Sequence, residues 1–187
     1  MGFWRRIDDM VEAANDHQIV VFIAGMMEPV GGNSAIVHAL ATELYLGSRA
    51  YDMKSRKSPE PAESRSQRQR FYREAGDILA TLGTHGHPAI THKLLETYEK
   101  FVDIDPRDVF LSVYRLVQAG ANNGYQRESL ATDLVVAFVG RYLADHRALL
   151  KEDKACRDGV RDMLDIFVRA GWTKARRLTH RLEELFR

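Results

Sequence analysis

The chain has 187 residues, of which 45% are hydrophobic and 28% are charged, a composition typical of an ordinary globular protein. Its 27 Lys and Arg residues are balanced by 26 Asp and Glu residues, so global charge cannot hold the protein on nucleic acid. The single cysteine, Cys156, excludes an internal disulfide and a cysteine-cluster zinc site. The longest apolar run, Ile19–Met27, is too short to span a bilayer. We therefore expect no membrane association and, with no signal-peptide pattern, a cytoplasmic location.

Residues 1–46 are expected to form a short helical N-terminal part. Apolar residues recur at helical spacing through residues 3–16. The run Ile19–Met27 cannot be assigned by periodicity alone. We interpret it as a buried helix, because no second strand signal is present to build a sheet around it. A further helix, capped by Asn33 or Ser34, completes this part of the chain.

Residues 47–66 interrupt the helical pattern. They are rich in serine, proline and charged residues and contain almost no large apolar residue after Met53. A segment of this composition has little to bury, so we expect an exposed charged loop or linker between the N-terminal part and the rest of the chain.

Residues 67–187 are predicted to form three antiparallel helix pairs. Apolar residues lie on one face of each predicted helix at a spacing of three and four residues. Aspartate followed by proline at Asp105-Pro106 is a typical helix start, with the aspartate as cap. Glycines are expected to end the first helix of each pair. The pairs are predicted at about 67–102, 105–147 and 153–187, with ending glycines at Gly83, Gly120 and Gly171.

A short internal sequence repeat, here named the echo, relates these helix pairs. The five residues Leu116–Gly120 match Phe167–Gly171 at an offset of 51 positions, and Leu79 and Gly83 match Leu116 and Gly120 at an offset of 37. Units of about 35–50 residues, each an outer helix, a turn and an inner helix, are typical of stacked helical repeats. The alternative is an irregular helical bundle in which the echo arises by chance.

The last two thirds of the chain resemble α-solenoid repeats of the HEAT or armadillo type. The closing segment, from Ala170-Gly171-Trp172 through Arg181 to Phe186, resembles the C-terminal helical module of large bacterial ATPase-type proteins. These resemblances imply an all-α fold of stacked antiparallel helix pairs and a non-catalytic binding or scaffold role. They also imply that the protein is part of, or a companion to, a larger bacterial NTPase system.

The predicted function is therefore that of a helical-repeat interaction module that binds a protein partner or a second copy of itself. Exposed turn residues and a basic stripe on the last helix are the side chains expected to make the contacts. The candidate partner-binding residues are Arg68, Tyr72, Arg73, Asn122, Asn123, Tyr125, Lys174, Arg177 and Arg181.

Nucleic-acid binding is the first alternative. Residues 49–73 contain eight basic and three acidic residues, with aromatic residues close by. Local clusters of this kind bind phosphates even when the whole protein is nearly neutral. The same pattern is typical of a solvated loop followed by a helix whose long basic side chains cover apolar surface.

A metal-binding enzyme is the second alternative. The turn and helix start around His85, His87 and His92 place three imidazoles within eight residues, and imidazole is a good ligand for zinc or nickel. No cysteine or nearby carboxylate completes the set. The segment Gly31-Gly32-Asn33-Ser34 lacks the spacing of a phosphate-binding loop. Cys156 has no histidine placed to activate it, so we predict no catalytic residue and no cofactor.

Overall fold

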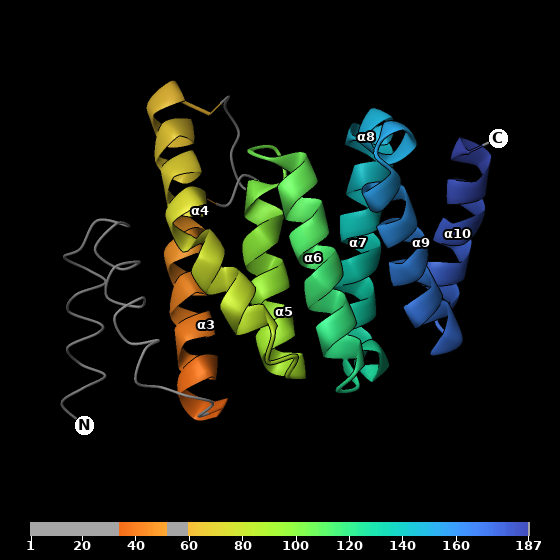
Figure 1. The fold of residues 1–187 in the computed structure, drawn as a ribbon, viewed down its shortest axis with the longest axis horizontal. Coiled ribbons are helices and arrows are strands. Elements are labelled where there is room, and N and C mark those ends of the chain that lie inside the picture. Colours follow the sequence, from red (N-terminus) through yellow and green to blue (C-terminus); the bar gives the residue numbers. More distant parts are fainter. Residues whose placement is uncertain (1–33, 52–59, 187) are drawn as a thin grey trace. The chain divides into compact units, whose positions relative to one another are not determined.

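The computed structural model describes residues 34–51 and 60–186, and every regular element in these two ranges is helical (Figure 1). The prediction of an all-α fold is confirmed. The predicted helices at 3–16 and Ile19–Met27 lie outside the described residues. The chain divides into two compact units, residues 1–82 and 83–187. None of the described helices is both long and apolar enough to cross a membrane.

The described part of the first unit contains α3 (Ser34–Ser48), the 3-10 helix η1 (Arg49–Tyr51) and α4 (Ala62–Gly83), whose last residue falls in the second unit. The expected loop at 47–66 is thus partly helical, because α3 continues to Ser48 and α4 begins five residues early. Residues 62–70 are mostly good helix formers, and Glu63 lies in the first turn, where a negative charge stabilises the helix dipole.

The second unit contains six α-helices and two short 3-10 helices. Aspartates cap two of the helices: Asp105 accepts a hydrogen bond from the backbone N–H of Asp108 at 3.0 Å, and Asp153 from that of Cys156 at 2.9 Å. The elements are α5 (Pro88–Tyr98), η2 (Glu99–Phe101), α6 (Pro106–Ala121), η3 (Tyr125–Arg127), α7 (Ser129–Asp145), α8 (Arg147–Glu152), α9 (Lys154–Arg169) and α10 (Thr173–Leu185).

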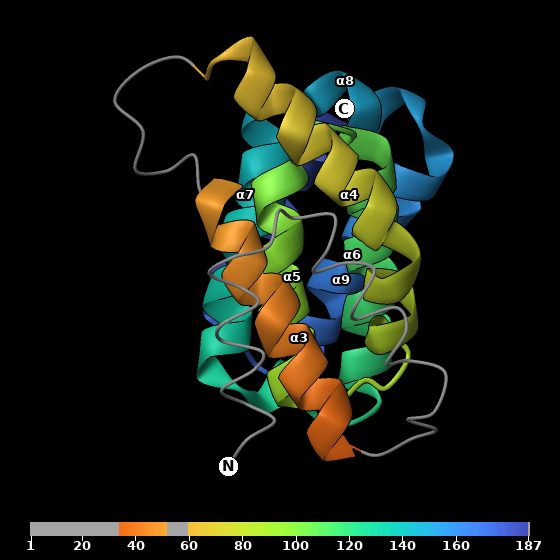
Figure 2. The same cartoon turned by 90° about the vertical axis from the view of Figure 1, so that its left-hand side faces the viewer.

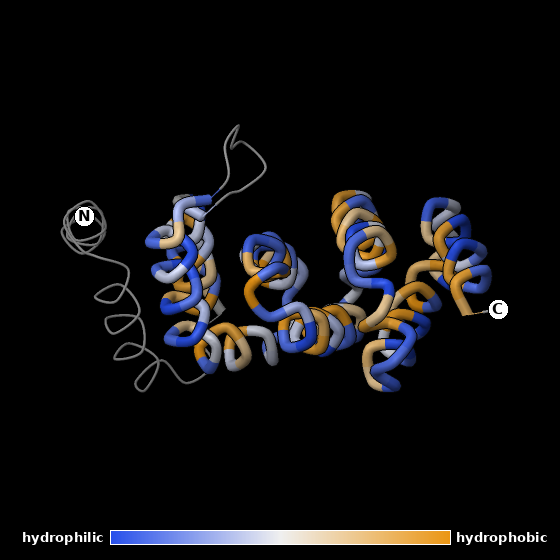
Figure 3. The backbone as a smooth tube through the Cα atoms, turned by 90° about the horizontal axis from the view of Figure 1, so that it is seen from above, coloured by the Kyte–Doolittle hydropathy of each residue, from blue (hydrophilic) through white to orange (hydrophobic). Residues whose placement is uncertain are grey.

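Two rows of helices build the second unit. Helix α6 packs against α9 in one row; in the other, α5 contacts α7, and α7 packs against α10. Seen from above, the two rows lie opposite each other (Figure 3), and the view at 90° to Figure 1 shows α5, α6 and α7 running roughly alongside one another (Figure 2). Each helix thus hides its apolar face against neighbours, which a single helix pair could not do.

Helix α6 packs aromatic side chains against α7 and approaches α9 closely. Phe110 on α6 is fully buried, with its ring 6.1 Å from that of Phe138 and 5.0 Å from that of Tyr142. On α9, Gly159 faces two rings of α6: a Cβ there would lie 3.2 Å from both Phe110 and Tyr114. The absence of a side chain at Gly159 lets the two helices approach closely.

Two of the glycines that were predicted to end helices, Gly171 and Gly120, have different structural roles. Gly171 follows α9 with φ of +93°, the left-handed conformation expected of a glycine just past a helix end. Gly120 does not end α6, which continues to Ala121. Its missing side chain is instead needed for packing, since a Cβ there would lie 2.8 Å from Thr91 on α5. The echo therefore marks positions where helices meet as well as positions where they stop.

Candidate partner-binding groove

A polar groove lies between the C-terminal ends of α6 and α9. Its volume is about 880 Å³, and three stretches of chain contribute to it: the end of α6, the 3-10 helix η3 and the end of α9. The lining residues are Gln118, Ala121, Asn122, Gln126, Arg127, Ile166, Arg169 and Ala170. This set is called the polar groove below.

A hydrogen bond and aromatic packing fix the position of the stretch between α6 and α7. Trp172 donates a hydrogen bond from its indole Nε1 to the backbone oxygen of Gln126 at 2.7 Å. Tyr125 is buried, and its ring meets that of Phe167 edge to face at 6.5 Å. Gly124 enters η3 with φ of +90°, which permits the sharp turn. The groove wall at Gln126 is therefore fixed by packing and by a hydrogen bond from the α9–α10 turn.

The orientation of Gln118 is set by a hydrogen-bonded chain that joins α6 to α9. Its side-chain Nε2 donates to the hydroxyl of Tyr114 at 2.7 Å, and that hydroxyl donates to Oδ2 of Asp162 at 2.6 Å. The bond to Asp162 raises the pKa of Tyr114 to about 12, so the hydroxyl keeps its proton at neutral pH. With its Nε2 engaged, Gln118 retains Oε1 as an acceptor for a ligand.

Two arginines give the polar groove a positive character. Arg169 lies 3.9 Å from Asp165 in an exposed ion pair, and Arg127 is exposed with no ion pair among the described residues. The side-chain oxygen Oε1 of Gln126 is buried without a hydrogen-bond partner in the described structure. Pockets for small organic ligands are mostly apolar, whereas this lining favours a hydrogen-bonding, acidic ligand.

The predicted turn residues take three different roles. Asn122 follows the last residue of α6 and lines the polar groove. Asn123 is exposed, and its Nδ2 donates to the backbone oxygen of Ala119 at 3.2 Å. Tyr125 was expected to be exposed but is 1% exposed, so it positions the groove wall rather than contacting a ligand directly.

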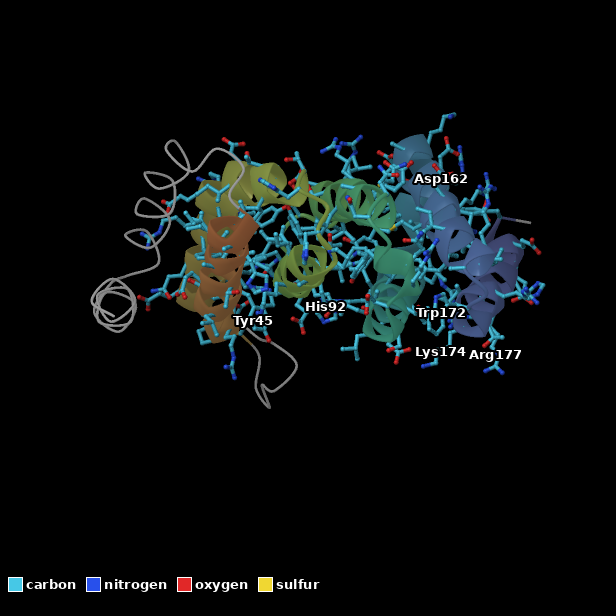
Figure 4. All side chains as sticks on the ribbon, turned by 90° about the horizontal axis from the view of Figure 1, so that it is seen from below. Tyr45, His92, Asp162, Trp172, Lys174 and Arg177 are labelled. Atoms are coloured by element: carbon cyan, nitrogen blue, oxygen red, sulfur yellow. The ribbon has the colours of Figure 1, made fainter. Side chains whose placement is uncertain are left out.

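The predicted basic stripe on α10 lies outside the polar groove. Lys174 pairs with Asp133 of α7 at 2.5 Å, whereas Arg177 and Arg181 are exposed. Viewed from below, Lys174 and Arg177 lie on the side of the second unit that carries α7 and α10, and Asp162 lies on the opposite side (Figure 4). The structure thus separates the two groups of contact residues that the sequence prediction had combined.

In the first unit, Arg68 and Tyr72 are not the exposed contact residues expected. Arg68 is fully buried and donates from Nη2 to Oε2 of Glu60 at 2.7 Å; Tyr72 is 8% exposed. Both occupy the buried face of α4, since a helix that begins at Ala62 carries them into that face along with Phe71. Arg73 is exposed, as predicted. The basic stretch 49–73 therefore offers fewer solvent-facing charges than its composition indicates.

The three histidines do not converge on one point. His87 caps α5, with its Nδ1 accepting from the backbone N–H of Ala89 at 3.3 Å, and His85 is exposed. His92 lies on α5, 4.0 Å from Glu96. Within the described ranges no three His, Cys, Asp or Glu side chains are grouped to hold a metal ion. The spacing of His85 and His87 reflects a turn at Gly86, whose φ is +63°.

Cys156 is unsuited to nucleophilic chemistry. The side chain is buried in the second unit, close to Asp153. Burial, and then the negative charge of Asp153, raises the pKa of the thiol to about 12. The reactive thiolate is therefore scarce at neutral pH.

No family model matches this chain, and neither the curated proteins nor the solved structures include a significant match to it. The site is consequently interpreted from its own geometry. The sequence analysis missed seven lining residues: Gln118, Ala121, Gln126, Arg127, Ile166, Arg169 and Ala170. The echo carried a signal for two of them, because Gln118 and Arg169 occupy the same polar position in the matched segments Leu116–Gly120 and Phe167–Gly171.

Proposed function

We propose that the protein is a non-catalytic helical-repeat interaction module whose polar groove binds an acidic segment of a protein partner. The observation that carries the proposal is the meeting of two arginines and three side-chain amides at the ends of the packed helices α6 and α9. Repeat proteins commonly bind partners along surfaces built from equivalent positions of successive repeats.

The packing of α6 on α9 supports a repeat of the HEAT type. Equivalent positions of the echo are buried in both helices: Val109 corresponds to Val160, and Val113 to Leu164. Each helix is followed by a turn and then by a helix of the second row, α7 or α10. A relation to a larger NTPase system, implied by the closing segment, remains a prediction.

The chemistry of the polar groove defines the partner segment. Guanidinium groups bind carboxylates through paired N–H donors, so Arg127 and Arg169 favour an Asp or Glu side chain. The acceptor oxygen of Gln118 favours a backbone N–H group. An extended acidic peptide supplies both kinds of group.

The first experiment places a photo-crosslinking amino acid at Asn122, in the polar groove, and at Ala144, an exposed position on α7 away from it. The native cell is irradiated and the cross-linked species is identified by mass spectrometry. We expect one protein to be captured from Asn122 and not from Ala144, with the cross-link in an acidic stretch. A cross-link to nucleic acid at Asn122, or no partner at all, would contradict the proposal.

The second experiment measures the affinity of the purified partner for charge-reversal variants. Arg127→Glu combined with Arg169→Glu should weaken binding about tenfold or more, and the loss should shrink at high salt. The control is Arg176→Glu, which reverses an exposed charge on α10 outside the groove and should change the affinity by less than about twofold. Equal effects of the double variant and the control would show that only net charge matters.

A further inference from the structure

A second cleft lies where α7, α8 and α10 meet. Its volume is about 260 Å³, and it is lined by Leu143, Arg147, Lys151, Arg181, Glu184 and Leu185. In Figure 1, α8 and the C-terminal end of α10 lie at the end of the second unit opposite the α6–α7 and α9–α10 turns. None of these residues lines the polar groove, so the two sites can be tested independently.

The cleft is lined by cationic side chains that have no ion-pair partner in the described structure. Arg147, Lys151 and Arg181 are all exposed and contribute three cations, against the single carboxylate of Glu184. None of these four groups forms an ion pair within the described ranges. Like charges held around one concave space repel one another, and an anion bound among them would relieve that repulsion.

Two arginines fix the walls of the cleft. Arg147 donates from Nε to the backbone oxygen of Leu143 at 2.7 Å, which orients its guanidinium and leaves both terminal NH₂ groups available. Arg157 donates from Nη1 to the backbone oxygen of Lys151 at 2.8 Å and so anchors the other end of α8. A guanidinium held in this way is preorganised for a carboxylate, which it can bind through two parallel hydrogen bonds.

The remaining lining limits the kind of anion that fits. Leu185 is half-buried and offers a small apolar surface beside the charges, whereas Leu143 is 3% exposed. Glu184 places one carboxylate in the same cleft, which reduces its attraction for any anion. The cleft thus combines a cationic rim with a small apolar surface at Leu185, which suits a short hydrocarbon body.

We propose that this cleft binds a carboxylate attached to a short apolar body. Two sources share that chemistry: a free small carboxylic acid, and the C-terminal residue of a peptide with an apolar side chain. In both, the carboxylate contacts Arg147, Lys151 and Arg181, and the hydrocarbon lies against Leu185.

The direct test titrates the full chain with N-acetyl-leucine and, as the matched control, with N-acetyl-leucinamide. Binding is followed by NMR through the Nε–Hε signals of Arg147 and Arg181, and by calorimetry. We expect saturable binding of the acid and affinity about tenfold lower, or undetectable, for the amide. Equal binding of both compounds, or binding of neither, overturns the proposal. Tighter binding of inorganic phosphate than of the acid overturns it in favour of a phosphate site.

Variants separate this site from a general effect of positive charge. Lys151→Gln and Arg181→Gln should each weaken binding of the acid about two- to fivefold. Glu184→Gln should strengthen it, because a repulsive carboxylate is removed. The matched control Arg176→Gln alters an exposed α10 cation outside the cleft and should leave the affinity unchanged. A loss of the same size in Arg176→Gln, or weaker binding in Glu184→Gln, contradicts the proposal.

The source of the carboxylate is decided by a third ligand, acetyl-Gly-Gly-Leu with a free C-terminus. If the peptide binds more tightly than N-acetyl-leucine, the residues before the carboxylate make contacts, and the cleft recognises a chain end. If the two bind equally, it recognises a small acid. Charge reversal at Arg127 and Arg169 should change neither titration, so failure here is distinguishable from failure of the polar groove.

Discussion

The second unit joins its helices by two different kinds of contact. Between α6 and α9, Gly159 allows the aromatic rings of Phe110 and Tyr114 to approach the opposite helix closely. Helix α10, in contrast, buries only the aliphatic side chains of Ala175, Leu178 and Leu182, and an exposed ion pair links Lys174 to Asp133 of α7. The first contact depends on shape, and the second on non-directional apolar burial with a charge pair at its edge.

This difference bears on where the chain can bind a partner. The α6–α9 contact fixes the spacing of the two helix ends that form the polar groove, and through Tyr114 it also fixes Gln118. The α7–α10 contact fixes no comparable hydrogen-bonded side chain in the groove lining. A change in the α6–α9 contact should therefore affect both folding and binding, and a change at the exposed α7–α10 ion pair should affect neither strongly.

The largest effect is expected from Phe110→Ala. The ring is fully buried against Phe138 and Tyr142, so its removal leaves a cavity and should lower the free energy of unfolding by about 3–5 kcal/mol. Urea denaturation measures this loss. Leu130→Ala is the control: Leu130 is 68% exposed, and its truncation should change stability by less than about 0.5 kcal/mol. Similar losses in the two variants would contradict the shape-dependent contact.

The next effect is expected from Gly159→Leu. A side chain at this position must displace the rings of Phe110 and Tyr114, which should cost about 1–3 kcal/mol of stability. Gly140→Ala on α7 is the matched control, because a Cβ at Gly140 meets nothing within 4 Å. That substitution should gain up to about 1 kcal/mol from helix propensity. If Gly159→Leu lowers the stability no more than Gly140→Ala does, the close approach of α6 and α9 is not required.

The sequence predicted the helices of the second unit better than it predicted their contacts. Apolar spacing and the Asp105-Pro106 start identify α6, and the echo aligns it with α9, because these signals are local. The groove could not be predicted in full, since Arg127 and Ile166 meet only after α6 and α9 pack together. The missed burial of Arg68 has a similar cause: composition indicates the charge of a segment but not which face of its helix is covered.

A smaller effect is expected from Tyr114→Phe, which removes the hydrogen bond to Asp162 and keeps the ring. The bond is partly exposed, so the loss should be about 0.5–1 kcal/mol at neutral pH. In the unfolded chain the tyrosine ionises near its ordinary pKa of 10, whereas the folded protein keeps the proton until about pH 12. The advantage of wild type over Tyr114→Phe is therefore complete below pH 10 and is lost as the pH rises from 10 to 12.

Denaturation of the two proteins from pH 8 to 12 checks this dependence. The other tyrosines are common to both chains, so their ionisation cancels in the difference. Because Tyr114 also holds Gln118, we expect Tyr114→Phe to weaken binding of the partner segment in the polar groove more than its small effect on stability would suggest. A constant stability difference across this pH range would show that Asp162 does not hold the proton of Tyr114.

The smallest effect is expected at the exposed pair of Lys174 and Asp133. Their side chains are 58% and 57% exposed, so water screens the attraction and the pair should contribute at most about 0.5 kcal/mol. A double-mutant cycle with Lys174→Met and Asp133→Asn isolates this coupling, and about 1 M salt should abolish it. A coupling above about 1 kcal/mol would mean that charge, and not apolar burial, orients α10 on α7. The two contacts would then differ less than their geometry indicates, and Lys174 would be committed to the fold rather than available to a partner.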